Sequence, residues 1–225
     1  MVSQMSDEPF IVPPCEREIE ILHQDVDLML IHKPHLLLSV PGRDPRNHDS
    51  VITRIQKDYP DANVCHRLDL DTSGIMIIPL RKSSLSHFGR QFQQRAVQKL
   101  YTAVVYGIVE QDSGTIDLPI RCDWENRPLQ MVDHEQGKHS LTHFEVAERD
   151  EENNCTRMLL KPVTGRSHQL RIHMRELGHP ILGCDLYAHP EAFKASERML
   201  LHATTISFIH PTTLKKFEGH CPPEF

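Results

Sequence analysis

Long apolar runs are absent from this chain. No uncharged hydrophobic stretch approaches the roughly 20 residues that a membrane-spanning helix needs. The first 20 residues also lack a basic segment followed by an apolar one, which is the pattern of a secretory signal. The sequence therefore predicts a cytoplasmic protein without a membrane segment.

Paired cysteines and metal-binding spacings are missing as well. The six cysteines are scattered, and none forms a C-x-x-C pair, so we expect free thiols. Sixteen histidines are present, but no H-E-x-x-H occurs. His168 and His173 are five residues apart and would not share a helical face. We expect neither a metal nor another cofactor.

The chain shows no internal repeat, no low-complexity linker and no regular alternation of strands and helices. Apolar patterns predict strands within residues 19–34, 74–80, 100–109, 142–148, 156–163 and 204–210. Helical spacing predicts helices over 50–60, 83–98 and 167–178. These elements favour an α+β fold with a mixed, largely antiparallel central sheet flanked by helices and loops. We expect a weakly ordered lead-in over residues 1–18 and a single domain over residues 19–225.

The distribution of charge is uneven. A formal net charge of −6 argues mildly against binding a partner as acidic as nucleic acid. Basic residues nevertheless gather in two segments, which contain Arg90, Arg95, Lys99, Lys161, Arg166, Arg171 and Arg175. A polyanion can bind one basic face of an acidic protein, although an ordinary solvated mixture of charges would give the same composition.

One short turn, HRLDLDTSG at residues 66–74, places a carboxylate between an arginine and two hydroxyl groups. Asp69 lies between Arg67 and the Thr72–Ser73 pair, directly before an apolar strand. A carboxylate on a loop fixed by a strand is well placed to act on a ligand, and a partly buried one needs a cation nearby to stay ionised. A turn-capping aspartate is an equally good interpretation of Asp69, and it fits Asp71 well.

Two further segments are weak indicators on their own. Tyr101 begins a β-branched run, where it could stack on a nucleobase but more often would pack in a core. In the segment GRSHQLRIH, Thr164–Gly165 is expected to open a helix, and a helix start beside Arg166 is a natural anion site. Arg171 would lie on the polar face of that helix, where it is a candidate cation for Asp69.

Together, HRLDLDTSG, KLYTA, GRSHQLRIH and LLHA, in this order, resemble the RluA family of pseudouridine synthases from about residue 19 to the C-terminus. The segments LLLSVPGR, DSVITRIQKDYP, IDLPIRCDWENRP and GHPILGCDLYA resemble its dual-specificity branch, which acts on large-subunit rRNA and on tRNA anticodon stem-loops. The resemblance implies the pseudouridine synthase fold, base flipping and RNA as the partner. A monomer is the default expectation. Many relatives carry an additional S4 RNA-binding domain, which this chain is too short to hold.

The resemblance also implies roles for individual residues. Asp69 would be the catalytic nucleophile, Tyr101 would pack against the uracil ring and Arg171 would pair with Asp69. The substrate-binding residues would be Arg67, which takes the place of the flipped base, together with Arg166, His168 and Leu201, which lines the pocket.

Three alternatives remain open at this point. The protein could bind RNA without catalysis, although binding alone needs no nucleophile. It could act on a single different rRNA site. It could also be a metal-dependent phosphodiesterase that uses Asp69 and Asp71 as ligands, although no further ligands accompany these two in the sequence.

Overall fold

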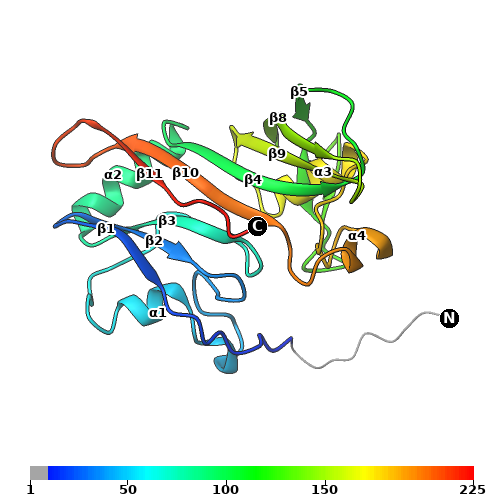
Figure 1. The fold of residues 1–225 in the computed structure, drawn as a ribbon. Helices are drawn as coiled ribbons and strands as arrows, with labels where there is room; N and C mark the ends of the chain where they lie inside the picture. Colours follow the sequence, from blue (N-terminus) through cyan, green and yellow to red (C-terminus); the bar gives the residue numbers. More distant parts are fainter. Residues whose placement is uncertain (1–9) are drawn as a thin grey trace.

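One large sheet organises the chain. The computed structural model describes residues 10–225. The path across the sheet is β1 (Glu20–Gln24), β2 (Leu28–Lys33), β3 (Ser73–Pro79), β10 (Leu201–Ile209), β4 (Gln98–Tyr106), β9 (Cys155–Pro162), β8 (Leu141–Asp150) and β5 (Ser113–Asp117), as Figure 1 shows. β11 (Lys216–His220) pairs with β10. A separate hairpin joins β6 (Ile120–Cys122) to β7 (Gln130–Val132).

Antiparallel pairing dominates this sheet. Only β3 and β10 run parallel among the paired strands of the described residues, with His202 opposite Ser73 and Ala203 opposite Gly74. The remaining elements are short helices: the 3-10 turn Pro45–Asn47, α1 (Val51–Ile55), α2 (Lys82–Gln93), α3 (Gln169–Glu176) and α4 (Pro190–Lys194). The predicted α+β class with a largely antiparallel sheet is confirmed.

Two helix predictions were wrong at their ends. α2 stops at Gln93, five residues before the predicted end, because Gln94 caps it and Arg95 takes a left-handed conformation with φ +57°. Ala96 is exposed in the turn that leads into β4. The first helix is also shorter than predicted: it ends at Ile55, and Ser50 provides its N-terminal cap.

The third helix differs more. α3 begins at Gln169, so Thr164 and Gly165 lie in a preceding loop and do not open the helix. His168 adopts a left-handed conformation with φ +55° and precedes the helix. The predicted polar face was wrong for Arg171, which is 3% exposed, because α3 is buried on nearly all sides over its first six residues.

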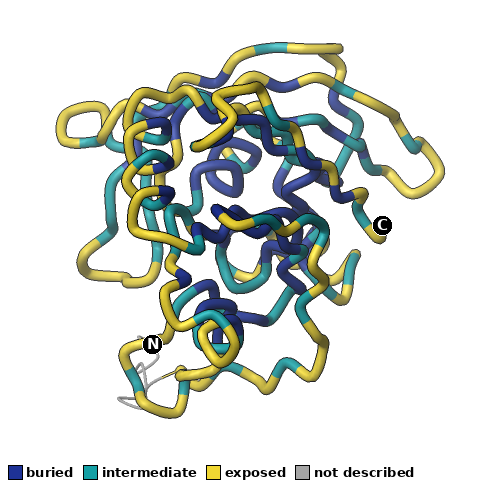
Figure 2. Tube along the Cα trace, turned by 90° about the vertical axis from the view of Figure 1, so that its left-hand side faces the viewer, coloured by how far each residue is buried: buried dark blue, intermediate teal, exposed yellow. Residues whose placement is uncertain are grey.

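Two hydrophobic cores lie side by side. One contains the apolar residues of β2 and β3 with those of α1, and the other contains those of β4, β9 and α3. Tyr101 packs against both. Buried segments occupy the middle of the molecule and exposed ones the peripheral loops (Figure 2). The boundary between the cores is therefore the place where side chains from both halves of the chain meet.

A glycine is required where β3 meets β10. A Cβ atom at position 74 would lie 2.3 Å from the carbonyl oxygen of Ala203, and Gly74 has φ +117°. Both the space and the backbone conformation therefore exclude a larger residue. This close approach brings the end of the 66–74 turn against the start of β10.

The predicted lead-in falls partly outside the described residues, because the structure describes the chain only from residue 10. Residues 10–19 contain no helix or strand, and β1 begins at Glu20. Within residues 10–225, no helix combines the length and the apolar character that crossing a bilayer requires.

Candidate active site

A buried ammonium group holds the turn that carries Asp69. Lys33 is fully buried at the end of β2, and its Nζ donates hydrogen bonds to the carbonyl oxygens of Pro34, Leu37 and Leu70 at 2.8, 2.7 and 3.1 Å. Burial lowers the pKa of Lys33 to about 7, while the nearby Asp71 and Asp69 act to raise it. Sequence reasoning missed this lysine, which fixes the backbone one residue after Asp69.

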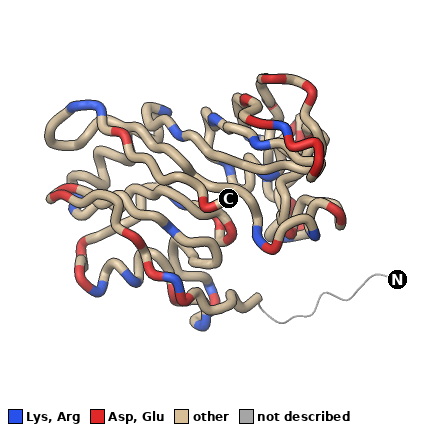
Figure 3. Tube along the Cα trace, in the orientation of Figure 1, with Lys and Arg blue, Asp and Glu red and all other residues tan. Residues whose placement is uncertain are grey.

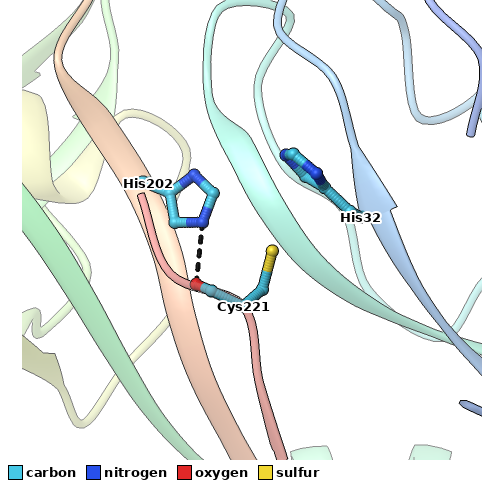
Figure 4. Close-up of side chains that lie close together, drawn as sticks. All are labelled: His32, His202 and Cys221. Carbon is cyan, nitrogen blue, oxygen red and sulfur yellow. Dashed lines mark hydrogen bonds between the residues drawn. The ribbon is translucent and has the colours of Figure 1, made fainter. Parts of the chain in front are cut away.

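A second network holds the far end of the same turn. Nε2 of His202 lies 3.0 Å from the carbonyl oxygen of Cys221, which only accepts, so Nε2 carries the proton (Figure 4). Nδ1 is then an acceptor, and it receives the Ser73 hydroxyl at 2.8 Å. The same hydroxyl oxygen accepts a hydrogen bond from Nη2 of Arg198 at 2.6 Å. Burial lowers the pKa of His202 to about 4, which is consistent with a neutral ring.

One cavity of about 540 Å³ contains every site residue that the sequence predicts. Its walls come from the 66–74 turn, the end of α2, β4, the loop before α3 and the start of β10. The predicted residues that line it are Arg67, Asp69, Tyr101, Arg166, His168, Arg171 and Leu201. Residues up to 134 positions apart thus meet in one place, at the boundary of the two cores.

The acidic and basic groups at the centre of this cavity face each other. Nη1 of Arg171 lies 4.0 Å from Oδ2 of Asp69, whose side chain is 34% exposed. Nη2 of the same guanidinium lies 2.5 Å from Oδ1 of Asp185. Burial acts to lower the pKa of Arg171, but its neighbours, Asp69 among them, raise it overall. The predicted cation is therefore beside Asp69, and it is shared with a second carboxylate that sequence reasoning missed.

Tyr101 and Leu201 form the apolar part of the wall. Tyr101 lies opposite Ala203 on β10 and Leu160 on β9, in the middle of the sheet. Burial, and to a lesser degree the charge of Asp69, raises the pKa of Tyr101. A phenol with a raised pKa keeps its proton at neutral pH, so this side chain offers mainly its ring.

The loop before α3 is held by one amide side chain. Oε1 of Gln169 accepts hydrogen bonds from the Thr164 hydroxyl at 2.8 Å and from the Arg166 backbone N–H at 3.0 Å. This arrangement leaves the Arg166 side chain exposed at the rim of the cavity. His168 is instead half-buried, and its Nδ1 lies 2.6 Å from the hydroxyl of Tyr187.

Positive charge lines the cavity. Its cationic residues are Arg67, Arg95, Lys99, Arg166 and Arg171, whereas Asp69 is the only carboxylate that residues 10–225 contribute to the wall. Acidic residues gather elsewhere, notably in the β8–β9 hairpin at the far end of the sheet (Figure 3). A chain with a net charge of −6 thus presents a local basic surface that suits a polyanion.

Lys99 is a cation of this surface that comes from the same strand as Tyr101. Lys99 precedes Tyr101 by two residues on β4, so the two side chains point to the same face of the sheet. Within the part of the chain that the structure describes, its ammonium group forms no hydrogen bond or ion pair. Burial lowers the pKa of Lys99 to about 8. The sequence placed it in a basic cluster but gave no sign that it lines the cavity.

The comparisons with known proteins agree with this geometry. The family model described as RNA pseudouridylate synthase matches residues 27–176, which is about two thirds of the chain. The chain belongs to the RNA pseudouridylate synthase family. It is therefore an isomerase that makes pseudouridine in RNA.

Named relatives of this synthase cover most of the chain. A dual-specificity RNA pseudouridine synthase RluA of Vibrio vulnificus is 51% identical over 89% of this chain and 81% of its own length. The protein of the same name from Yersinia pestis is 48% identical over 91% and 99%. In structure, the chain resembles human RNA pseudouridylate synthase domain containing 1, with a TM-score of 0.78 and 29% identity over 95% of this chain and 86% of that one. The expected resemblance to the RluA family is confirmed.

Two groups of possible metal ligands lie away from the synthase's cavity. His32, His202 and Cys221 form one, and Asp25, Asp27 and His210 form the other. In the first group, both ring nitrogens of His202 already take part in the hydrogen bonds described above. Neither group includes Asp69. Membership of an isomerase family also disfavours the phosphodiesterase alternative, which needed Asp69 as a metal ligand.

Asp71 does not cap the turn as the sequence suggested. Its side chain forms no hydrogen bond with any residue that the structure describes. Burial, followed by the charge of Asp185, raises the pKa of Asp71. The carboxylate faces the interior beside Arg171 and Lys33, which partly offset its desolvation.

Proposed function

We propose that this synthase isomerises uridines in RNA hairpin loops by base flipping and nucleophilic attack from Asp69. The observation that carries the proposal is the position of Asp69 as the single carboxylate of a cation-lined cavity, 4.0 Å from a buried arginine. A nucleophilic carboxylate must be ionised and must be reachable from solvent. The adjacent guanidinium supplies a counter-charge for the carboxylate, and the 34% exposure of Asp69 leaves it within reach of a substrate.

The reaction needs little besides this carboxylate. Making pseudouridine breaks the N1–C1′ bond, turns the uracil ring and joins C5 to C1′. C5 loses its proton and N1 gains one, so there is no net redox change or hydrolysis. Asp69 attacks either C1′ of the ribose or C6 of the uracil and is released when the new bond forms. Arg171 balances the charge of Asp69, while Tyr101 and Leu201 hold the ring in place during its rotation.

The remaining residues deal with the RNA. The target atoms lie inside a base stack, so the nucleotide must be extruded at a cost of a few kcal/mol. Arg67 is exposed in the same turn as Asp69, where it can enter the vacated place and stack on the neighbouring bases. Arg166 and His168 bind the RNA backbone at the rim.

We further propose two kinds of substrate: a hairpin loop of large-subunit rRNA and the anticodon stem-loop of tRNA. The relatives' name, dual-specificity RNA pseudouridine synthase, supports two substrates. Specific RNA recognition mostly targets loops with unstacked bases, and one cavity can accept a bent loop from either RNA. Residues 19–225 would act as one catalytic domain and as a monomer in the cytoplasm, without metal or cofactor.

The test offers an isolated anticodon stem-loop and an rRNA hairpin separately to the purified protein, with EDTA present. Pseudouridine in both RNAs is the expected result. Modification of only one would mean a synthase with a single substrate, and dependence on added divalent metal would contradict the metal-free mechanism. Binding of both hairpins without any pseudouridine would favour the RNA-binding alternative.

A further inference from the structure

The chain contains a single tryptophan, and it lies in an unusual place. Trp124 is 66% exposed, in the connection between β6 and β7. A lone exposed apolar side chain is common in soluble proteins and by itself indicates nothing. Trp124 differs because the guanidinium carbon of Arg127 lies 3.9 Å from the centre of its ring. One face of the indole is thus covered by a cation while much of its surface stays in water.

The connection that carries this pair is ordered by its own hydrogen bonds. Asp123 donates its backbone N–H to the carbonyl oxygen of Leu129 at 3.0 Å, which continues the pairing of β6 and β7 by one step. The Asp123 side chain also accepts hydrogen bonds from the backbone N–H and the amide group of Asn126 at 3.3 and 2.9 Å. Trp124 and Arg127 are therefore presented in a defined geometry before any ligand binds.

The same hairpin is anchored on the wall of the cavity. The backbone N–H of Gln130 donates to the hydroxyl of Tyr187 at 2.9 Å. That hydroxyl lies 2.6 Å from Nδ1 of His168, which lines the cavity. Gln130 pairs with Cys122 in the hairpin, so Trp124 lies only two residues beyond the anchoring position. The tryptophan itself is outside the cavity wall, on a hairpin that is tied to one of the lining residues.

We propose that Trp124 and Arg127 form a stacking platform for a nucleobase of the RNA loop that contains the target uridine. The inference rests on the proposed function. Extruding one nucleotide unstacks its neighbours, which gain from a new aromatic surface. An indole with a guanidinium on it supplies both a stacking face and a cation, and any base has the π-face that such a platform binds. The position outside the cavity wall suits a base of the loop other than the target.

Because no other tryptophan is present, the tryptophan emission of the protein, excited where tyrosine does not absorb, reports on Trp124 alone. Titration of the wild-type protein with the anticodon stem-loop should quench this emission in proportion to binding. Trp124→Ala should raise the Kd and the KM for the stem-loop about ten-fold, with kcat at saturating RNA changed little. Trp124→Phe keeps an aromatic ring and should recover most of the affinity. Phe193→Ala is the matched control, because Phe193 is an exposed aromatic (47%) outside the cavity wall and should leave binding unchanged.

The outcomes separate this inference from the proposed function. Pseudouridine formation with no change of fluorescence at saturating RNA, or wild-type affinity in Trp124→Ala, would overturn the platform while leaving the reaction intact. Quenching together with weaker binding by Trp124→Ala, but without any pseudouridine, would leave the platform intact and overturn the reaction. Trp124 is too exposed for its replacement to disturb the core, and the circular dichroism of the variants checks this.

Discussion

Arg171 lies with its Nη1 atom 4.0 Å from Oδ2 of Asp69, at the boundary between the two hydrophobic cores. The guanidinium is 3% exposed, so little water screens it from the carboxylate. Nη2 of the same group contacts Asp185 at 2.5 Å. Arg171 thus pairs with two carboxylates: Asp69, which lines the cavity, and Asp185, which lies beside it. Both pairs hold the guanidinium in position.

Replacing Arg171 with methionine should therefore cripple turnover. The variant keeps a long apolar stem but removes the cation that lies 4.0 Å from the Asp69 carboxylate. We expect kcat to fall by at least two orders of magnitude, a loss of about 3 kcal/mol of transition-state stabilisation. Turnover close to the wild-type rate in this variant would separate the role of Arg171 from that of Asp69.

Arg171→Lys is the matched control for that experiment, because it keeps the charge but not the forked geometry. It should retain more activity than the methionine variant. Removing a partner from a buried ion pair costs about 3–5 kcal/mol of stability. Asp69 and Asp185 both keep contact with solvent, so replacing Arg171 should cost less stability than this. Urea denaturation of each variant checks that the protein is folded at the assay temperature.

Tyr101→Phe should have only a small effect on activity. The Tyr101 hydroxyl has no hydrogen-bond partner among residues 10–225, and burial raises its pKa, so it is a poor proton donor at neutral pH. We expect kcat/KM within about three-fold of the wild-type value, because the ring is retained. Tyr101→Ala, which removes the ring, should lose far more. A large loss in the phenylalanine variant would mean that the hydroxyl takes part in proton transfer.

Lys99 should make RNA binding sensitive to pH in the mildly alkaline range. Its pKa of about 8 means that the free protein loses this positive charge as the pH rises through that value. A phosphate group needs the ammonium form, so the Kd for a stem-loop should increase between pH 7 and pH 9. In Lys99→Met, binding should be weaker at pH 7, less dependent on salt and nearly independent of pH over this range. An equally steep pH dependence in the variant would exclude Lys99 as the titrating group.

His202 should make the fold sensitive to acid. In the unfolded chain a histidine takes up a proton near pH 6.5, but the folded protein resists protonation of His202 until about pH 4. Protons therefore favour the unfolded state within this window, and stability falls as the pH drops from 6.5 to 4. The shift corresponds to roughly 3 kcal/mol. Urea midpoints at pH 7, 5.5 and 4.5 measure it. In His202→Asn the protein should be less stable at pH 7 but should lose less on acidification.

Sequence reasoning predicted the strands well because their signals are local. The apolar run after Gly74 and the β-branched run after Tyr101 indicate strands without knowledge of their neighbours. The ends of helices were less predictable, since α2 stops where Arg95 turns into a left-handed conformation that no residue type at that point required. α3 looked amphipathic, yet it is buried on nearly all sides because it inserts between β7 and the sheet.

The site was predictable only where its residues lie close together in the sequence. Asp69, Arg67 and their turn form one segment, so their spacing alone suggested a function. Lys33 and Asp185 were missed because their roles depend on contacts across 37 and 14 residues, to Leu70 and Arg171, which no local pattern reveals. The segment GRSHQLRIH identified Arg171 as the candidate cation for Asp69. The sequence did not predict that Arg171 is buried.

The most direct test of the central claim is pseudouridine formation by Asp69→Asn on a stem-loop that the wild-type protein modifies. Asparagine keeps the shape of the side chain and removes the charge and the nucleophile. Binding, measured by titration of the same stem-loop, should change little, and Asp71→Asn, as the matched control in the same turn, should keep substantial activity. The account predicts no detectable pseudouridine from Asp69→Asn, even with enzyme in excess over RNA. Pseudouridine formed by this variant at a measurable rate would contradict it.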